Sequence, residues 1–214
     1  MNTSTSFAKL FAAILVGGLL LALAMVPFAG LSGWAVSATN KTMNSNVQDI
    51  SANDDLPRMS VITDRDGNAM AYIYDQHRVE MNPANISQNM KDAIVAIEDR
   101  RFYEHGGVDI KGTLRAAAAN VTSGGVSEGA STLNQQYVKN YLLLVKADST
   151  EQQAAAIETS IPRKLREMKM AAELDKKFSK DEILARYLNL VSFGNNAYGV
   201  QTAAQTYFGK NAKD

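Results

Sequence analysis

The segment Met90-Lys-Asp-Ala-Ile-Val-Ala-Ile-Glu98-Asp-Arg-Arg-Phe-Tyr-Glu-His105 joins an apolar stripe to a charged cluster. The stripe has the i, i+3, i+4 and i+7 spacing of one helix face, and its members are Met90, Ala93, Ile94 and Ile97. We therefore predict a helix that ends near Glu98 and leaves this carboxylate partly buried. Burial and a helix C-terminus both raise the pKa of a carboxylate, which suits a general base near neutral pH. The alternative is an exposed acid in a solvated cluster.

Helical patterns continue through the rest of the chain. We predict helices over residues 110–121 and 132–145, with a short Ala-rich helix possible within 146–160. Another helix begins near Pro162, because proline is tolerated in a first turn. The sequence Ser179-Lys-Asp-Glu182 is a capping box and predicts the start of a fifth helix. The apolar face of that helix consists of Ile183, Leu184, Tyr187, Leu188 and Val191.

Strand signals precede these helices. Two β-prone runs, at residues 59–63 and 69–74, flank Asp66-Gly67, a pattern typical of a β-hairpin. A calcium loop is the rival interpretation, but its glycine would come later in the EF-hand spacing. The expected fold class is therefore mainly α with a small β-hairpin.

The N-terminal region predicts a membrane anchor. Residues 10–40 hold no charged side chain, and 10–36 are long and apolar enough to form a transmembrane helix. Lys9 favours a cytoplasmic tail at 1–9, which places the rest of the chain on the extracytoplasmic side. The alternative is a cleaved signal peptide ending at Val36-Ser37-Ala38, although the apolar stretch exceeds the length of a signal h-region. We assign 37–84 to a polar spacer and the β-hairpin.

Composition excludes several function classes. The 22 basic and 22 acidic residues balance, so there is no basic excess that would indicate nucleic acid binding. The chain has no cysteine, which excludes disulfides and thiolate metal sites. Its two histidines, His77 and His105, are far apart in sequence, and we predict no protein metal site.

Two further groups of residues have the chemistry of a binding site. Thr132, Gln136 and Lys139/Asn140 form a polar stripe at i, i+4 and i+7/i+8, which suits a polyhydroxyl ligand or an ordinary solvent-facing helix side. In Arg163-Lys164-Leu-Arg-Glu167, Arg163 and Lys164 precede Glu167 by four and three positions, so on a helix both cations can contact its carboxylate. This is either a surface ion pair or a phosphate site, since Arg and Lys both bind phosphate oxygens.

Taken together, these segments resemble the peptidoglycan glycosyltransferase domain of class A penicillin-binding proteins, glycosyltransferase family 51. Four ordered motifs carry the resemblance, which covers residues 85–214: Glu98 to Gly107, Gly129-Ala-Ser-Thr-Leu-Asn-Gln-Gln136 with Tyr137 to Asn140, Arg163 to Glu167, and Lys180 to Asn189. The second motif has Ala130 where the family commonly has glycine. The resemblance implies a lysozyme-like fold. The family domain normally continues further, so we expect 85–214 to be incomplete at its C-terminus.

The resemblance implies an enzyme of cell wall biogenesis that polymerises lipid II into glycan strands. The expected reaction is an inverting transfer from lipid pyrophosphate to the 4-hydroxyl of GlcNAc. Glu98 and Glu167 are the expected catalytic residues. The expected substrate-binding residues are Asp99, Phe102, His105, Ser131, Thr132, Gln135, Gln136, Lys139, Asn140, Arg163 and Lys164. Alternatives are a truncated, non-catalytic lipid II-binding module and a muralytic lysozyme-like enzyme.

The same resemblance sets the expected partners. They are lipid II, the nascent glycan strand, the membrane bilayer and proteins of cell wall synthesis or division, with no nucleic acid. No cofactor is required, and a divalent cation such as Mg²⁺ at the pyrophosphate is an open option. The expected location is the cell membrane, with a single span and the catalytic domain on the extracytoplasmic side.

Overall fold

The computed structural model describes residues 56–123, 129 and 131–214. The chain divides into two units, Met1–Ser45 and Asn46–Asp214, and every described residue belongs to the second. The predicted anchor at 10–36 and most of the spacer lie outside the described residues. Within the part that is described, no helix combines the length and the hydropathy that a membrane span requires.

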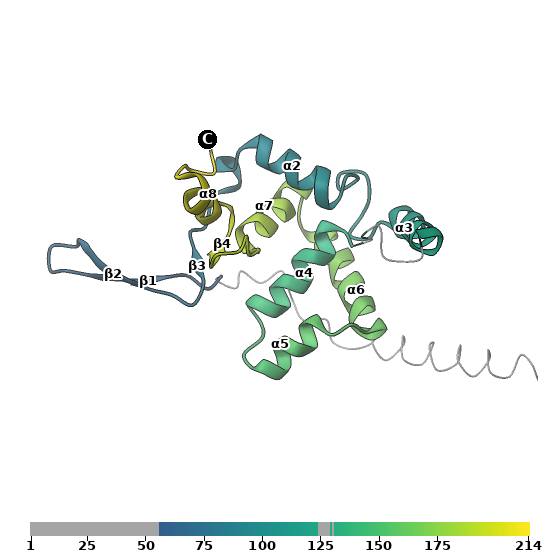
Figure 1. The fold of residues 1–214 in the computed structure, drawn as a ribbon, viewed down its shortest axis with the longest axis horizontal. Helices are drawn as coiled ribbons and strands as arrows, with labels where there is room; N and C mark the ends of the chain where they lie inside the picture. Colours follow the sequence, from purple (N-terminus) through teal and green to yellow (C-terminus); the bar gives the residue numbers. More distant parts are fainter. Residues whose placement is uncertain (1–55, 124–128, 130) are drawn as a thin grey trace, which may run out of the picture. The chain divides into compact units, whose positions relative to one another are not determined.

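The described region is mainly helical with two small sheets (Figure 1). Its helices are η1 Pro83–Asn85, α2 Gln88–Glu98, α3 Ile110–Ser123, α4 Leu133–Leu144, α5 Thr150–Ile157, α6 Ile161–Lys177, α7 Lys180–Leu190 and α8 Val200–Phe208. Its strands are β1 Ser60–Thr63, β2 Ala69–Ile73, β3 His77–Arg78 and β4 Ala197–Tyr198. The predicted helices and the predicted hairpin are confirmed.

The core forms where α4 packs on α6 and α7. Apolar side chains from all three helices are removed from solvent there, which supplies the main driving force for folding. Among them are Leu133, Val138, Met170, Leu174, Ile183, Leu184 and Leu188. All five residues of the predicted apolar face of α7 and its C-cap are buried, so this prediction is confirmed.

Side-chain caps explain where the helices begin. A serine or threonine oxygen accepts a backbone N–H in the first turn, which satisfies a donor that has no partner within the helix. The caps of α2, α4, α5, α6 and α7 are Ser87, Thr132, Ser149, Ser160 and Ser179. In return, the Glu182 carboxylate accepts the backbone N–H of Ser179, which confirms the predicted capping box.

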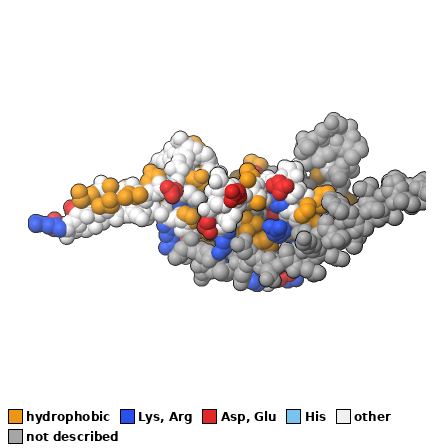
Figure 2. Space-filling model, turned by 90° about the horizontal axis from the view of Figure 1, so that it is seen from below, with side chains coloured by type: hydrophobic (Ala, Val, Ile, Leu, Met, Phe, Trp, Pro, Cys, Tyr) orange, Lys and Arg blue, Asp and Glu red, His pale blue; other side chains and the backbone are white. Residues whose placement is uncertain are grey.

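The β1–β2 hairpin is antiparallel, and its turn is held by Asp64. The Asp64 carboxylate accepts the backbone N–H groups of Asp66 and Asn68, each at 2.9 Å, and Gly67 takes the positive φ of +86° that the turn needs. All residues of both strands are exposed, and Figure 2 shows hydrophobic side chains along the hairpin surface.

Helix α2 departs from the predicted burial. Met90 and Ile94 are half-buried as expected, but Ala93 is exposed and Ile97 is 80% exposed. The reason is that the earlier turns of α2 pack on the core, whereas its last turn, residues 96–98, extends beyond that contact. The expectation that Glu98 is partly buried is therefore wrong.

The second small sheet was not predicted. Strands β3 and β4 pair in parallel, and the guanidinium of Arg78 is buried beneath them. Arg78 donates to the carbonyl oxygens of Pro57, Asn189 and Leu190 at 2.9–3.0 Å. These bonds attach the segment before α2 to the end of α7.

Candidate active site

Glu98 is the last residue of α2, and its carboxylate is exposed to solvent. Its Oε2 accepts a hydrogen bond of 2.9 Å from Nε2 of Gln136 on α4. The oxygen of the same amide accepts from the hydroxyl of Tyr187 on α7, at 3.1 Å. Three helices therefore fix the position of one accessible carboxylate.

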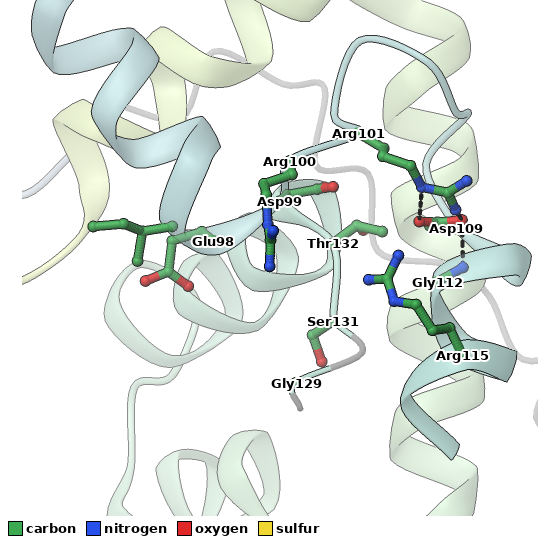
Figure 3. A pocket seen from close by; sticks show the side chains of 11 residues that line it. Glu98, Asp99, Arg100, Arg101, Asp109, Gly112, Arg115, Gly129, Ser131 and Thr132 are labelled. Carbon is green, nitrogen blue, oxygen red and sulfur yellow. Dashed lines mark hydrogen bonds and ion pairs between the residues drawn. The ribbon is translucent and has the colours of Figure 1, made fainter. Parts of the chain in front are cut away.

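A pocket of about 150 Å³ lies beside Glu98, between the end of α2, α3 and the segment that leads into α4 (Figure 3). Figure 3 shows the guanidinium groups of Arg100 and Arg115 pointing into this space. Arg101 forms an ion pair with Asp109, whose carboxylate also accepts the N–H of Gly112 in the first turn of α3. The pocket therefore combines one exposed acid with cations able to attract an anionic ligand.

Asp99, the residue after Glu98, holds neighbouring segments together. Its carboxylate accepts the N–H of Leu133 at 3.0 Å, at the start of α4, and bonds Nε2 of His105 at 2.9 Å. Burial by itself lowers the pKa of His105, but the hydrogen bonds to Asp99 and to the Gly106 carbonyl outweigh it, so the pKa is raised overall. Asp99 and His105 therefore hold the first motif against α4.

Several other residues expected to bind substrate are buried. Phe102 is fully buried, with the Lys180 ammonium 4.8 Å from its ring centroid, so its ring packs in the core instead of facing the pocket. Thr132 donates to the Gly107 carbonyl at 2.8 Å and caps α4. Gln135 is also buried. Phe102 and Gln135 therefore lie below the surface of the site, whereas Thr132 also lines the pocket beside Glu98.

The second acid, Glu167, lies in α6 with only 3% of its side chain exposed. Arg163 forms an ion pair with its Oε1, and the Lys164 ammonium lies 3.5 Å from its Oε2. Both cations occupy the first turns of α6, after Ser160 and Pro162. A carboxylate buried between two cations does not fit the surface ion pair that was the alternative interpretation.

Lys164 connects the two acidic centres. Its Nζ donates to Ser131 Oγ at 2.6 Å, and Ser131 lines the pocket beside Glu98. Burial lowers the pKa of Lys164, and the positive charges of Arg163 and Lys139 lower it further against the opposing effect of Glu167. Three cations are therefore close enough to repel one another, an arrangement that a bound anion would stabilise.

A second hollow, of about 220 Å³, borders the same cluster on the side of α5. Lys146, Arg163 and Arg166 contribute cations to its lining, and Glu167 contributes the acid. The basic character of the first turns of α6 therefore extends to both sides of Glu167.

This geometry can be compared with known proteins. The family model described as "Transglycosylase" matches residues 66–214. That match takes in both acids, all three cations and every motif. The chain belongs to the transglycosylase family. The matched residues 66–214 therefore belong to a glycosyltransferase domain of the kind found in class A penicillin-binding proteins.

Relatives of this transglycosylase include several penicillin-binding proteins. "Penicillin-binding protein 1A" of Clostridium perfringens is 37% identical over 98% of this chain and 29% of the relative. The protein of the same name from Neisseria flavescens is 40% identical over 70% of the chain and 17% of the relative. "Penicillin-binding protein 4" of Bacillus subtilis is 36% identical over 92% and 31%. The chain thus spans less than a third of the length of these relatives.

Among residues 56–123, 129 and 131–214, no group of three or more His, Asp or Glu side chains could hold a metal ion. Glu167 already has a cation beside each oxygen. The structure also adds residues to this transglycosylase site that the sequence did not predict, among them Arg100, Arg115 and Tyr187. The sequence predicted Tyr187 only as a member of the apolar face of α7. No local pattern distinguishes a tyrosine that only fills the core from one whose hydroxyl also reaches a site.

Proposed function

We propose that this chain is a membrane-anchored peptidoglycan glycosyltransferase that polymerises lipid II by inverting transfer. The observation that supports this most directly is the link through Ser131. It joins Lys164, which lies beside Glu167, to a residue of the pocket that Glu98 also lines. A base and an anion site are the two parts that this reaction needs.

In the proposed reaction, Glu98 takes the proton from the 4-hydroxyl of the acceptor GlcNAc. The hydroxyl oxygen forms a bond to C1 of the lipid-linked MurNAc, and the bond from C1 to the pyrophosphate oxygen breaks with inversion at C1. An accessible carboxylate whose other oxygen is held by Gln136 suits this role, because a general base must come within hydrogen-bond reach of the proton it removes.

The leaving group explains the cations. Inverting glycosidases use a second carboxylic acid to protonate a poor leaving group. Pyrophosphate leaves as a stable anion, so Lys139, Arg163 and Lys164 can replace that acid by stabilising the charge that develops on its oxygens. In this proposal Glu167 holds the two α6 cations in place. A divalent cation bound chiefly by the substrate's phosphates stays a prediction.

The proposed membrane location follows from the substrate. Lipid II carries its reactive pyrophosphate at the bilayer surface, and an anchor at residues 10–36 would keep the enzyme there. The curated relatives are named as penicillin-binding proteins, which agrees with a role in the cell wall. The single span, the lysozyme-like architecture and any division partners belong to the proposal.

The test is polymerisation of labelled lipid II by the 214-residue chain in detergent, with Glu98→Gln alongside and binding of lipid II measured for both. We expect glycan strands from the parent, none from E98Q, and similar binding by the two proteins. Equal polymerisation by E98Q would overturn the role of Glu98. Binding without turnover by the parent would instead support the non-catalytic module.

The muralytic alternative predicts a different product. A lytic enzyme would release sugars from finished cell wall and has no use for cations placed to receive pyrophosphate. Release of soluble glycan from purified sacculi, with no polymer from lipid II, would favour it over the proposed synthesis.

A further inference from the structure

The ring of Tyr187 is buried in the core, and its hydroxyl group forms a hydrogen bond with a residue of the site. The residue is 5% exposed and packs in the hydrophobic core of α4, α6 and α7. Phenylalanine would fill this volume equally well. A buried hydroxyl needs a hydrogen-bond partner, and here it is the side-chain oxygen of Gln136, at 3.1 Å.

This contact determines which way the Gln136 amide faces. The amide has one accepting oxygen and one donating nitrogen, and a carboxylate can only accept. With Tyr187 donating to Oε1, Nε2 faces Glu98 Oε2 at 2.9 Å. The reverse orientation would place the amide oxygen against the carboxylate, where two acceptors repel each other. All three groups are satisfied in one orientation only.

We propose that Tyr187 is a positioning residue for Glu98: through the oriented Gln136 amide it holds Oε2 of the carboxylate and leaves Oε1 to receive the acceptor proton. Among the described contacts, no hydrogen bond involves Oε1 of Glu98. This inference rests on the proposed function, because it assigns Glu98 as the base.

The charges around Glu98 come from several elements. Asp99, Arg100 and Arg101 follow it in the chain, Asp109 and Arg115 lie across the pocket at α3, and Tyr187 lies on α7. Burial, followed by the negative charge of Glu98, raises the pKa of Tyr187 to about 12. The phenol therefore keeps its proton throughout the working range of an enzyme and remains a donor to Gln136.

The experiment compares Tyr187→Phe, Gln136→Ala and the double variant, with kcat and KM for lipid II measured for each. We expect Y187F to lower kcat roughly three- to tenfold, as for loss of one hydrogen bond, with little change in KM. In the Q136A background, Y187F should have no further effect.

Tyr103→Phe is the matched control, because it removes a tyrosine hydroxyl that bonds Asp181 instead of Gln136. Independent of turnover, the side-chain amide NMR signals of Gln136 should shift in Y187F and stay as in the parent in Y103F. Unchanged Gln136 amide signals in Y187F, or effects of Y187F and Q136A that add, overturn the positioning role. If E98Q is inactive and Y187F is unaltered, only this inference fails; if E98Q is fully active, the proposed base fails first.

Discussion

The ammonium group of Lys164 donates to Ser131 Oγ at 2.6 Å, joining α6 to the segment that leads into α4. The two residues are 33 positions apart in the chain. Through this bond, a cation next to Glu167 borders the pocket of Glu98. The relationship gives Lys164 two expected effects, on ligand binding and on its pH dependence.

Replacing Lys164 with methionine should weaken binding of lipid II about 10- to 100-fold, the loss typical of a hydrogen bond to a charged group. Binding requires the charged amine, and burial lowers the pKa of Lys164. Affinity should therefore fall as pH rises, at a lower pH than for an ordinary lysine. Titration of binding from pH 7 to 10 measures both effects.

Lys164→Arg is the control for this titration, because arginine keeps its charge across the whole range. The alkaline loss of affinity should move upward or disappear in K164R. Loss at the same pH in parent and K164R would mean that another group titrates.

Replacing Glu167 with glutamine should destabilise the fold and leave two cations without a counter-charge. Breaking a buried ion pair by removing one partner costs roughly 3–5 kcal/mol in other proteins. The matched control on the same helix is Glu173→Gln, whose ion pair with Lys176 is exposed to solvent and should contribute little to stability. Urea unfolding of both variants gives the comparison, and equal losses would contradict the buried role of Glu167.

The pairing of His105 with Asp99 should make stability depend on pH. The pKa of His105 is raised in the folded state, so its contribution is complete below the unfolded value of about 6.5 and is lost as pH rises through the folded value. The free energy of unfolding should therefore decrease from pH 5.5 to 8.5, and less steeply in His105→Gln. The same slope in H105Q as in the parent would assign it to other groups.

Two adjacent glycines should respond differently to alanine. A Cβ at Gly107 would overlap the backbone carbonyl of Ala171 in α6, whereas at Gly106 the nearest atom would be Asp175 Oδ2 at 3.6 Å. Gly107→Ala must shift the first motif from α6 and should cost at least about 1–3 kcal/mol, as overpacking does. Gly106→Ala should cost much less. Thermal unfolding of both variants tests this close approach, and similar melting temperatures would contradict it.

The sequence by itself determined the helices and most of their boundaries. Caps such as Ser179 with Glu182 act within one turn, and apolar periodicity shows which face will be buried, so both are readable from neighbouring residues. The ordered motifs likewise contained Glu98 and Glu167 with their cations. The catalytic and substrate-binding roles assigned from them remain predictions.

Tertiary structure decided how these residues meet. Glu98, Gln136 and Tyr187 come from three helices, with separations of 38 and 51 positions, and Arg78 bonds carbonyls more than 100 positions away. It also left Glu98 exposed, where the local pattern had predicted partial burial, and it buried Phe102, which the resemblance had assigned to substrate binding. Local signals specify a helix and its apolar face, but the exposure of an end residue and the partner of a hydroxyl depend on what packs against them. That depends on contacts between distant parts of the chain.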